Sequence, residues 1–393
     1  MQFISRIKEW ITLLIKRCLK LIGIDQIKMD SPDIITNGEK QTENSCTHNS
    51  NQFALDESNH TSEKTIDGIE EINLVRGFAL PHLGSGFGTC QDSLFADANN
   101  LFFSVVDGVS EGIGQMYFVK LLSRYKRDQD DVRLRKDDAQ FLHGEWRKFQ
   151  EELIESNRMP PITLGKYMAG MAANSTYIRL KFYKDCASDK ILWKCAVLGD
   201  SAMIHLNISD DEMEIKHVIM SNENVRNDNC VYSDEEGYYD FSEAPDQIDP
   251  EGTWLENEAY LENIMCQKGD IFLLMTDHVS EWILRNANDT KARIKKLLEV
   301  QTQDQFQELI DKERRPDPET GVCNMGDDDS TALIVEIVNP SKLGFKVTAI
   351  IDPREKYEEE KKMRNKQAVE VEPSSQLDQS LSETNTIGDD RKN

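Results

Sequence analysis

Residues 91–109 read QDSLFADANNLFFSVVDGV, and this stretch decides the fold. Two apolar runs of strand length flank residues 97–100, Asp-Ala-Asn-Asn, which have the composition of a turn. The midpoint between positions 92 and 107 falls between Asn99 and Asn100. A hairpin closed there sets Asp92 opposite Asp107. The pattern predicts two antiparallel strands that bring two carboxylates to one sheet edge.

A second pair of aspartates stands at strand ends later in the chain. Asp277 follows the apolar run Ile271–Thr276, and Asp328 comes just before Thr331–Val335. The end of one antiparallel strand coincides with the start of its neighbour, so these two side chains are also expected to meet. Crowded carboxylates repel unless something positive lies among them, and no Arg or Lys flanks these four aspartates. Oxygen ligands without a His or Cys cluster favour Mg²⁺ or Mn²⁺ over zinc.

Each aspartate taken singly also fits an ordinary structural role. Asp-Gly at a strand end is a frequent turn signal, so Asp107-Gly108 alone indicates a turn more often than a ligand. Residues 327–329, three consecutive aspartates, fit a solvated acidic loop. The order, spacing and strand context of the four aspartates together favour a shared site.

The composition excludes a general nucleic-acid binder. The 393 residues include 46 Lys and Arg against 71 Asp and Glu, a formal charge of −25, and such a surface repels a polyanion. The eight cysteines form no Cys-x-x-Cys pair, which argues against a zinc site or a disulfide framework and indicates a reducing compartment. We therefore expect a cytoplasmic protein.

The remaining pattern predicts an α+β domain with antiparallel sheet, because strands and helices come partly in blocks. Apolar, β-rich runs predict strands, and amphipathic runs predict helices. The predicted strands are 101–106, 191–198, 202–206, 271–275 and 331–338, and the predicted helices are 114–125, 139–156, 164–180, 292–298 and 305–312.

Composition divides the chain into four parts. Residues 1–24 read as a basic amphipathic helix, and residues 25–71 as a polar, disordered linker. Residues 72–352 form the folded domain, within which the acidic segment 210–249 reads as an insertion or flap. Residues 353–393 read as a short charged helix followed by a loose tail.

Five motifs resemble the markers of the metal-dependent protein phosphatase family, also called the protein phosphatase 2C family, across roughly Arg76 to Val338. The family's markers are Asn-Gln/Glu-Asp, an apolar strand into Asp-Gly, Gly-Asp-Ser after a strand, Thr-Asp-Gly after a Gly-Asp-led strand, and a late Asp-Asn/Asp-x-Thr. The sequence as a whole is similar to those of bacterial branches of the family. The chain carries, in the family order, Cys90-Gln91-Asp92, Val106-Asp107-Gly108-Val109, Leu198-Gly199-Asp200-Ser201, Lys268-Gly269-Asp270 leading to Thr276-Asp277-His278, and Asp328-Asp329-Ser330-Thr331.

The resemblance implies an α-β-β-α sandwich of two antiparallel sheets flanked by helices, and a role for each matched residue. Asp107 would bridge two ions, Mg²⁺ or Mn²⁺, and the Gly108 carbonyl would reach one of them. Asp277 and Asp328 would hold the second ion, and Asp92 would support the first. Asp200 would either help bind a third ion or serve only its own turn.

The implied reaction is hydrolysis of phosphoserine and phosphothreonine in a protein substrate by a water that the two ions share. Three departures from the family pattern bear on it. Val109 stands where many members have His, and His278 replaces the usual Gly. The phosphate-binding Arg that many members place before the first motif is missing, and Arg76 is the nearest upstream candidate.

Three functions from different classes fit the sequence. The first is an active phosphatase in which Asp107 and Asp277 are catalytic through the ions they hold. The second is a catalytically weak or inactive relative that binds phosphoproteins or a partner complex. The third is a scaffold or membrane-tethered regulator.

The first 24 residues carry a prediction of their own. Their Lys and Arg alternate with an apolar face that includes Trp10, which suits contact with anionic lipid at the inner membrane face or docking on a protein surface. If the helix contacts lipid, deleting residues 1–24 abolishes cosedimentation with anionic vesicles and leaves turnover unchanged. Equal sedimentation of the truncated and full-length chains would exclude this anchor.

Overall fold

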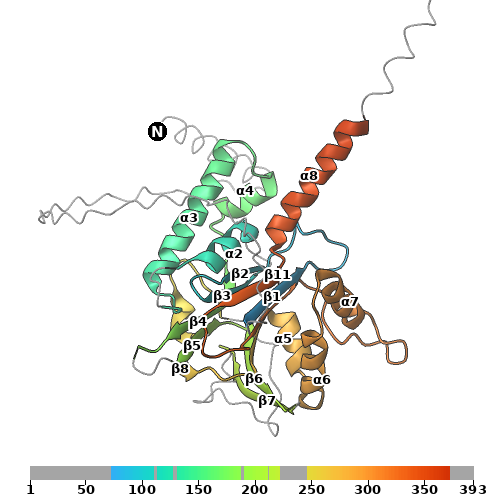
Figure 1. The fold of residues 1–393 in the computed structure, drawn as a ribbon. Coiled ribbons are helices and arrows are strands. Elements are labelled where there is room, and N and C mark those ends of the chain that lie inside the picture. The colour runs from blue at the N-terminus through green and yellow to red at the C-terminus, as the bar shows by residue number, and fades with distance from the viewer. Residues whose placement is uncertain are drawn as a thin grey trace, which may run out of the picture. The chain divides into compact units, whose positions relative to one another are not determined.

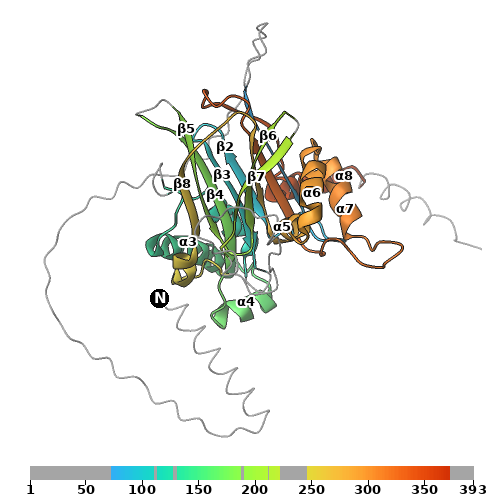
Figure 2. The same ribbon diagram turned by 90° about the horizontal axis from the view of Figure 1, so that it is seen from below.

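The computed structural model describes residues 72–109, 113–126, 131–186, 190–210, 212–221 and 246–371, all within one compact unit, Gly68–Asn393. Its two sheets stack face to face between two groups of helices (Figures 1 and 2). One sheet has six strands in the order β11-β1-β10-β9-β6-β7, and the other has five in the order β2-β3-β4-β5-β8. The predicted α+β sandwich is therefore confirmed.

The described strands and helices run along the chain as follows. The strands are β1 (Asn73–Leu80), β2 (Ser93–Asp97), β3 (Phe102–Gly108), β4 (Ser175–Lys184), β5 (Ile191–Leu198), β6 (Ala202–Ser209), β7 (Glu212–Ile219), β8 (Ala259–Met265), β9 (Asp270–Met275), β10 (Ser330–Glu336) and β11 (Phe345–Ile350). The helices are α2 (Gln115–Arg124), α3 (Lys136–Glu155), α4 (Pro161–Met168), α5 (Asp277–Leu284), α6 (Ala287–Leu298), α7 (Gln303–Arg314) and α8 (Pro353–Val371), with a 3₁₀ turn, η2 (Thr253–Asn257).

Three apolar layers hold the sandwich together. Side chains of the two sheets interdigitate in the middle layer, where Phe103 of β3 and Phe272 of β9 are fully buried. The outer face of the six-stranded sheet packs on α5, α6 and α7, and the outer face of the five-stranded sheet packs on α2 and α3. Because both faces of the central strands are covered, β9 is a continuous apolar run rather than an alternating one.

The hairpin predicted from residues 91–109 forms in the expected register. Ser93 pairs with Val106 and Asp97 with Phe102 in an antiparallel ladder. Continued by one residue, this register sets Asp92 opposite Asp107. The antiparallel pairing of β9 with β10, in which Met275 faces Ala332, likewise brings the start of α5 beside the residues before β10.

The sequence misassigns one long segment. Residues 164–180 were predicted as a single helix, but α4 ends at Met168 and β4 begins at Ser175. Gly170 has a φ of +84°, the left-handed conformation that ends helices, and the β-branched and aromatic residues after it are buried on both faces. Gly170 therefore indicated the end of the helix more reliably than the spacing of the apolar residues did.

Two smaller differences concern the sheet edges. The segment 210–249, predicted as an insertion or flap, contains the edge strand β7, while residues 222–245 lie outside the described residues. Strand β11, which the sequence did not predict, pairs with β1 in parallel, so the six-stranded sheet is not wholly antiparallel.

The predictions for residues 1–71 and for the tail beyond 371 lie outside the described residues. The charged helix expected near residue 353 is α8. Among the described helices, none combines the length and the apolar character needed to cross a membrane. The five described cysteines are all free thiols.

His143 of α3 generates a prediction about acid stability. The side chain is buried between Phe118 and Trp146, and burial lowers the pKa of His143 from 6.5 to about 4. Between pH 6.5 and 4, His143 therefore binds a proton in the unfolded chain but not in the folded chain. Its contribution to stability is fully present above pH 6.5 and is lost as the pH falls toward 4. Between pH 7 and 4.5, the free energy of unfolding should fall by roughly 2 kcal/mol less in His143→Phe than in the wild-type chain, as measured by urea denaturation. An unchanged pH dependence in the variant would show that His143 does not titrate with unfolding.

Candidate functional site

The site lies where ends of strands from both sheets meet. Asp107 is the penultimate residue of β3, and Asp92 immediately precedes β2 in the five-stranded sheet. Asp277 is the first residue of α5, directly after β9 of the six-stranded sheet. One hydroxyl joins these parts. The Thr276 hydroxyl donates to the Asp92 carboxylate at 3.2 Å and accepts the backbone N–H of Thr331 at 3.0 Å.

Asp277 interacts electrostatically with each of the other four predicted aspartates. Burial, followed by the charges of Asp277, Asp92 and Asp200, raises the pKa of Asp107 well above its usual range. The pKa of Asp92 is raised in the same way, by burial and then by neighbouring carboxylates. Burial and the charge of Asp277 raise the pKa of Asp200 to about 7. The pKa of Asp328 is also raised, by burial first and with a contribution from Asp277.

Two carboxylate oxygens in this cluster have no protein partner. Oδ1 of Asp92 and Oδ1 of Asp200 are buried, and neither has a hydrogen-bond donor within reach. A buried, unpaired carboxylate oxygen is costly, and the cost falls when a cation or a proton approaches it. Oxygen donors of this kind, with no thiolate among them, suit a hard divalent cation such as Mg²⁺ or Mn²⁺.

Asp329 is a buried residue whose part in the site the sequence did not reveal. Its carboxylate accepts the backbone N–H groups of His82 at 2.9 Å and of Gln91 at 2.5 Å. It thereby ties the segment before Asp92 to the loop that carries Asp328. Ligand atoms of His82, Asp328 and Asp329 also lie within 4.8 Å of one another.

Arg314 is a basic residue beside the acidic loop that the sequence flanking the aspartates does not reveal. This buried side chain reaches the site from the end of α7 and donates to the Pro81 carbonyl at 3.0 Å, to the Ser330 hydroxyl at 2.9 Å and to the carbonyl of Asp328. Its hydrogen bonds hold the backbone of the acidic loop. The four aspartates first identified keep their carboxylates out of these hydrogen bonds.

His278, one of the departures from the family pattern, is a partner of Asp277. Its Nδ1 lies 2.9 Å from Oδ1 of Asp277, which also accepts the His278 backbone N–H at 2.6 Å. Although burial lowers it, the hydrogen bond and charge of Asp277 raise the pKa of His278 to about 9. Gly326 makes room for the ring, since a Cβ there would lie 2.4 Å from Cδ2 of His278.

Arg76, the upstream candidate for binding phosphate, is committed to the structure instead. It is buried in β1, where it forms an ion pair with Glu336 and donates to the carbonyls of Val300 at 2.9 Å and Leu298 at 2.8 Å. These contacts fasten the end of α6 to the sheet. Arg76 is therefore not available to a substrate.

The comparisons with known proteins give the following. No family model matches the chain, and no curated protein matches it. Among the solved structures, PppA of Pseudomonas aeruginosa, described as a key regulatory component of T6SS, is 15% identical over 67% of this chain and 98% of its own, with a TM-score of 0.34. A bacterial serine phosphatase is 11% identical over 66% and 96%, with a TM-score of 0.38. Serine-threonine phosphatase 2C of Toxoplasma gondii is 13% identical over 66% and 93%, with a TM-score of 0.32. Of these three proteins, the one from Toxoplasma gondii bears the name of the family that the sequence motifs resemble.

Gly108 generates a prediction about the geometry of the site. A Cβ at this position would lie 2.7 Å from the Gln91 carbonyl oxygen and 3.1 Å from Val119, so Gly108→Ala must push β3 away from the segment that carries Asp92. We expect a loss of about 2 kcal/mol or more in the free energy of unfolding, measured with urea. Gly144→Ala is the matched control, because nothing lies within 4 Å of a Cβ there and alanine favours the helix. Equal stability of the two variants would contradict the close contact.

Proposed function

We propose that the chain is a phosphoserine/phosphothreonine protein phosphatase that depends on divalent metal ions. The observation that supports the proposal is the electrostatic interaction of Asp92, Asp107, Asp200 and Asp328 with Asp277, together with the unpaired buried oxygens of Asp92 and Asp200. Structural ion pairs do not explain this arrangement. Among the described residues, no lysine or arginine forms an ion pair with Asp92, Asp107, Asp200 or Asp277, whereas surface aspartates elsewhere pair readily.

Each aspartate has a proposed role in holding ions. Asp107 would bridge two ions, the Gly108 carbonyl would reach one of them, and Asp92 would support that first ion. Asp277 and Asp328 would hold the second ion, and Asp200 would help Asp277 to hold a weaker third one. When bound, Mg²⁺ or Mn²⁺ would lower the pKa of a shared water and balance the charge on the phosphoryl oxygens.

The chain's other residues would keep these ligands in place. Thr276 orients Asp92 by a hydrogen bond to Oδ2, and Asp329 anchors the backbone of Gln91. Arg314 fixes the loop of Asp328. His278, protonated at neutral pH because its pKa is about 9, orients Asp277 and partly offsets its charge. Such supporting contacts matter because ligands displaced by about an ångström lose much of their effect.

A catalytically weak or silent module that binds phosphoproteins is the second candidate. The burial of Arg76 favours it, since this removes the upstream residue that could have gripped a substrate phosphate. The retained carboxylates favour the enzyme, because a module that only binds phosphate gains nothing from gathering negative charge beside it.

Metal-dependent turnover tests the proposal. With millimolar Mn²⁺, we expect release of phosphate from p-nitrophenyl phosphate and from a phosphothreonine peptide, and we expect Asp107→Asn to reduce kcat at least 100-fold because the bridging carboxylate is lost. Glu308→Gln is the control, since it removes one charge from an exposed position on α7. Background rates in the wild-type chain would exclude the enzyme and leave the silent module.

Metal binding can be measured apart from turnover. Saturating Mn²⁺ should raise the melting temperature by about 5 °C or more, because cations relieve the repulsion among the carboxylates. Asp107→Asn should lessen this rise while increasing the melting temperature of the metal-free chain. Calorimetry should count two ions, or three if Asp200 takes part. A melting temperature that does not respond to Mn²⁺ would contradict the proposed ligand set.

A further inference from the structure

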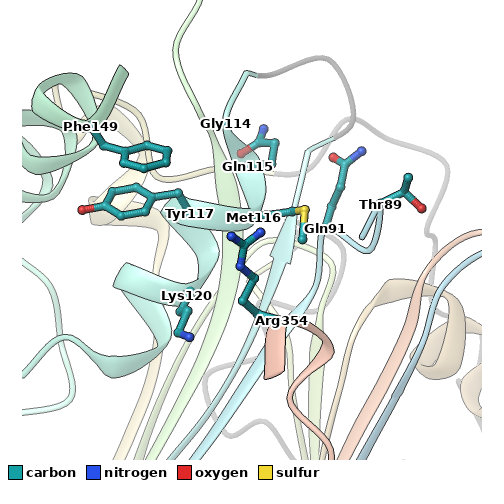
Figure 3. A pocket seen from close by; sticks show the side chains of 9 residues that line it. All are labelled: Thr89, Gln91, Gly114, Gln115, Met116, Tyr117, Lys120, Phe149 and Arg354. Carbon is teal, nitrogen blue, oxygen red and sulfur yellow. The ribbon is translucent and has the colours of Figure 1, made fainter. Parts of the chain in front are cut away.

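A cavity of about 470 Å³ opens beside the acidic cluster. Its walls come from the segment before β2, from α2 and α3, and from the first turn of α8 (Figure 3). Gln91, which lines it, directly precedes Asp92, and its carbonyl oxygen lies where a Cβ on Gly108 would be 2.7 Å away. A residue that lines the cavity, Gln91, is therefore the chain neighbour of a proposed metal ligand, Asp92.

Two glutamines line the cavity, and each has a buried side-chain oxygen without a hydrogen-bond partner. Gln115 is 5% exposed, and its amide nitrogen donates to the Val109 carbonyl, which fixes the side chain and leaves Oε1 without a donor. Oε1 of Gln91 is also buried without a donor. A buried acceptor without a donor costs on the order of 1–3 kcal/mol, but a ligand in the cavity reaches these two oxygens only if the glutamine side chains turn toward it.

One wall of the cavity is aromatic. Tyr117 of α2 and Phe149 of α3 stack with ring centroids 4.0 Å apart and planes 8° from parallel, as Figure 3 shows. A stacked pair of this kind is rigid. It offers a flat apolar surface to a chain that lies along it.

Two cationic side chains also line the cavity. Lys120 of α2 forms no ion pair among the described residues, and the residue is half-buried. Arg354 reaches from the start of α8 toward Met116 in Figure 3. Its ion pair with Glu358, at 3.2 Å, joins two groups that are each about 40% exposed. Such an exposed pair is weak and exchanges easily for another carboxylate.

We propose that this cavity binds the part of a phosphoprotein that flanks the phosphorylated residue, and that Lys120 and Arg354 select an acidic side chain in that flank. The assignment rests on the proposed function, because the phosphorylated residue itself is placed at the aspartates. It also names a source of substrate affinity that Arg76 does not supply. On a chain with a net charge of −25, a local pair of cations directs an anionic segment to one place.

The test uses two phosphothreonine peptides that differ only in whether the flanking positions carry glutamate or glutamine. The full-length chain in Mn²⁺ should show a kcat/KM about five- to tenfold higher for the glutamate peptide, which corresponds to one or two exposed charge pairs. Lys120→Met/Arg354→Met should lose this preference. Lys291→Met/Lys295→Met, which removes the same charge from the exposed side of α6, should keep it.

A binding measurement separates the cavity from the chemistry. Fluorescence anisotropy with labelled peptides that carry a non-hydrolysable phosphonate should give the same preference, and added salt should weaken it. Preferential binding of the glutamate peptide without any turnover would support the cavity and overturn the phosphatase proposal. Equal binding of the two peptides by the wild-type chain would overturn the assignment of the cavity, as would a preference that persists in a folded Lys120→Met/Arg354→Met variant.

Discussion

The burial of several carboxylates at one edge of a double sheet is the constraint on which the rest of this structure depends. Like charges in a poorly solvated place repel, and each raised pKa in the cluster measures that repulsion together with the loss of water. The hairpin of β2 and β3 and the connection from β9 to α5 nevertheless hold Asp92, Asp107 and Asp277 there. Among the described residues, His278 beside Asp277 is the one cationic side chain that pairs with these aspartates, so the cluster would suit a ligand of opposite charge.

The surrounding residues stabilise the backbone rather than neutralise the cluster. Arg314 donates hydrogen bonds to the Pro81 and Asp328 carbonyls and to the Ser330 hydroxyl. Asp329 accepts two backbone N–H groups from the segment before Asp92. The charged groups of Arg314 and Asp329 therefore hold the loops in place. At the centre, Oδ1 of Asp92 and Oδ1 of Asp200 remain without a hydrogen-bond partner, which suits the binding of a cation.

Charge is divided between two neighbouring regions of the same face. The aspartates would repel an anionic substrate until cations are bound, while Lys120 and Arg354 attract it on the other side of Gln91. If both proposals hold, binding of metal and recognition of the flanking segment are separate steps with separate salt dependence. This division also gives α8 a purpose beyond packing, since its first turn supplies Arg354.

The sequence by itself determined the register of the first hairpin, the ends of the central strands and the placement of aspartates at those ends. These features follow from turn chemistry and apolar runs, which are local signals. It failed at residues 164–180, where the helix-ending Gly170 outweighed the helical periodicity. Only the tertiary structure decided that Arg76 serves the sheet, that Arg314 and Asp329 support the site, and that Gln91, Phe149 and Arg354 line one cavity. These pairings join residues up to more than 200 positions apart. They depend on how the two sheets and their helices pack, which no local pattern encodes.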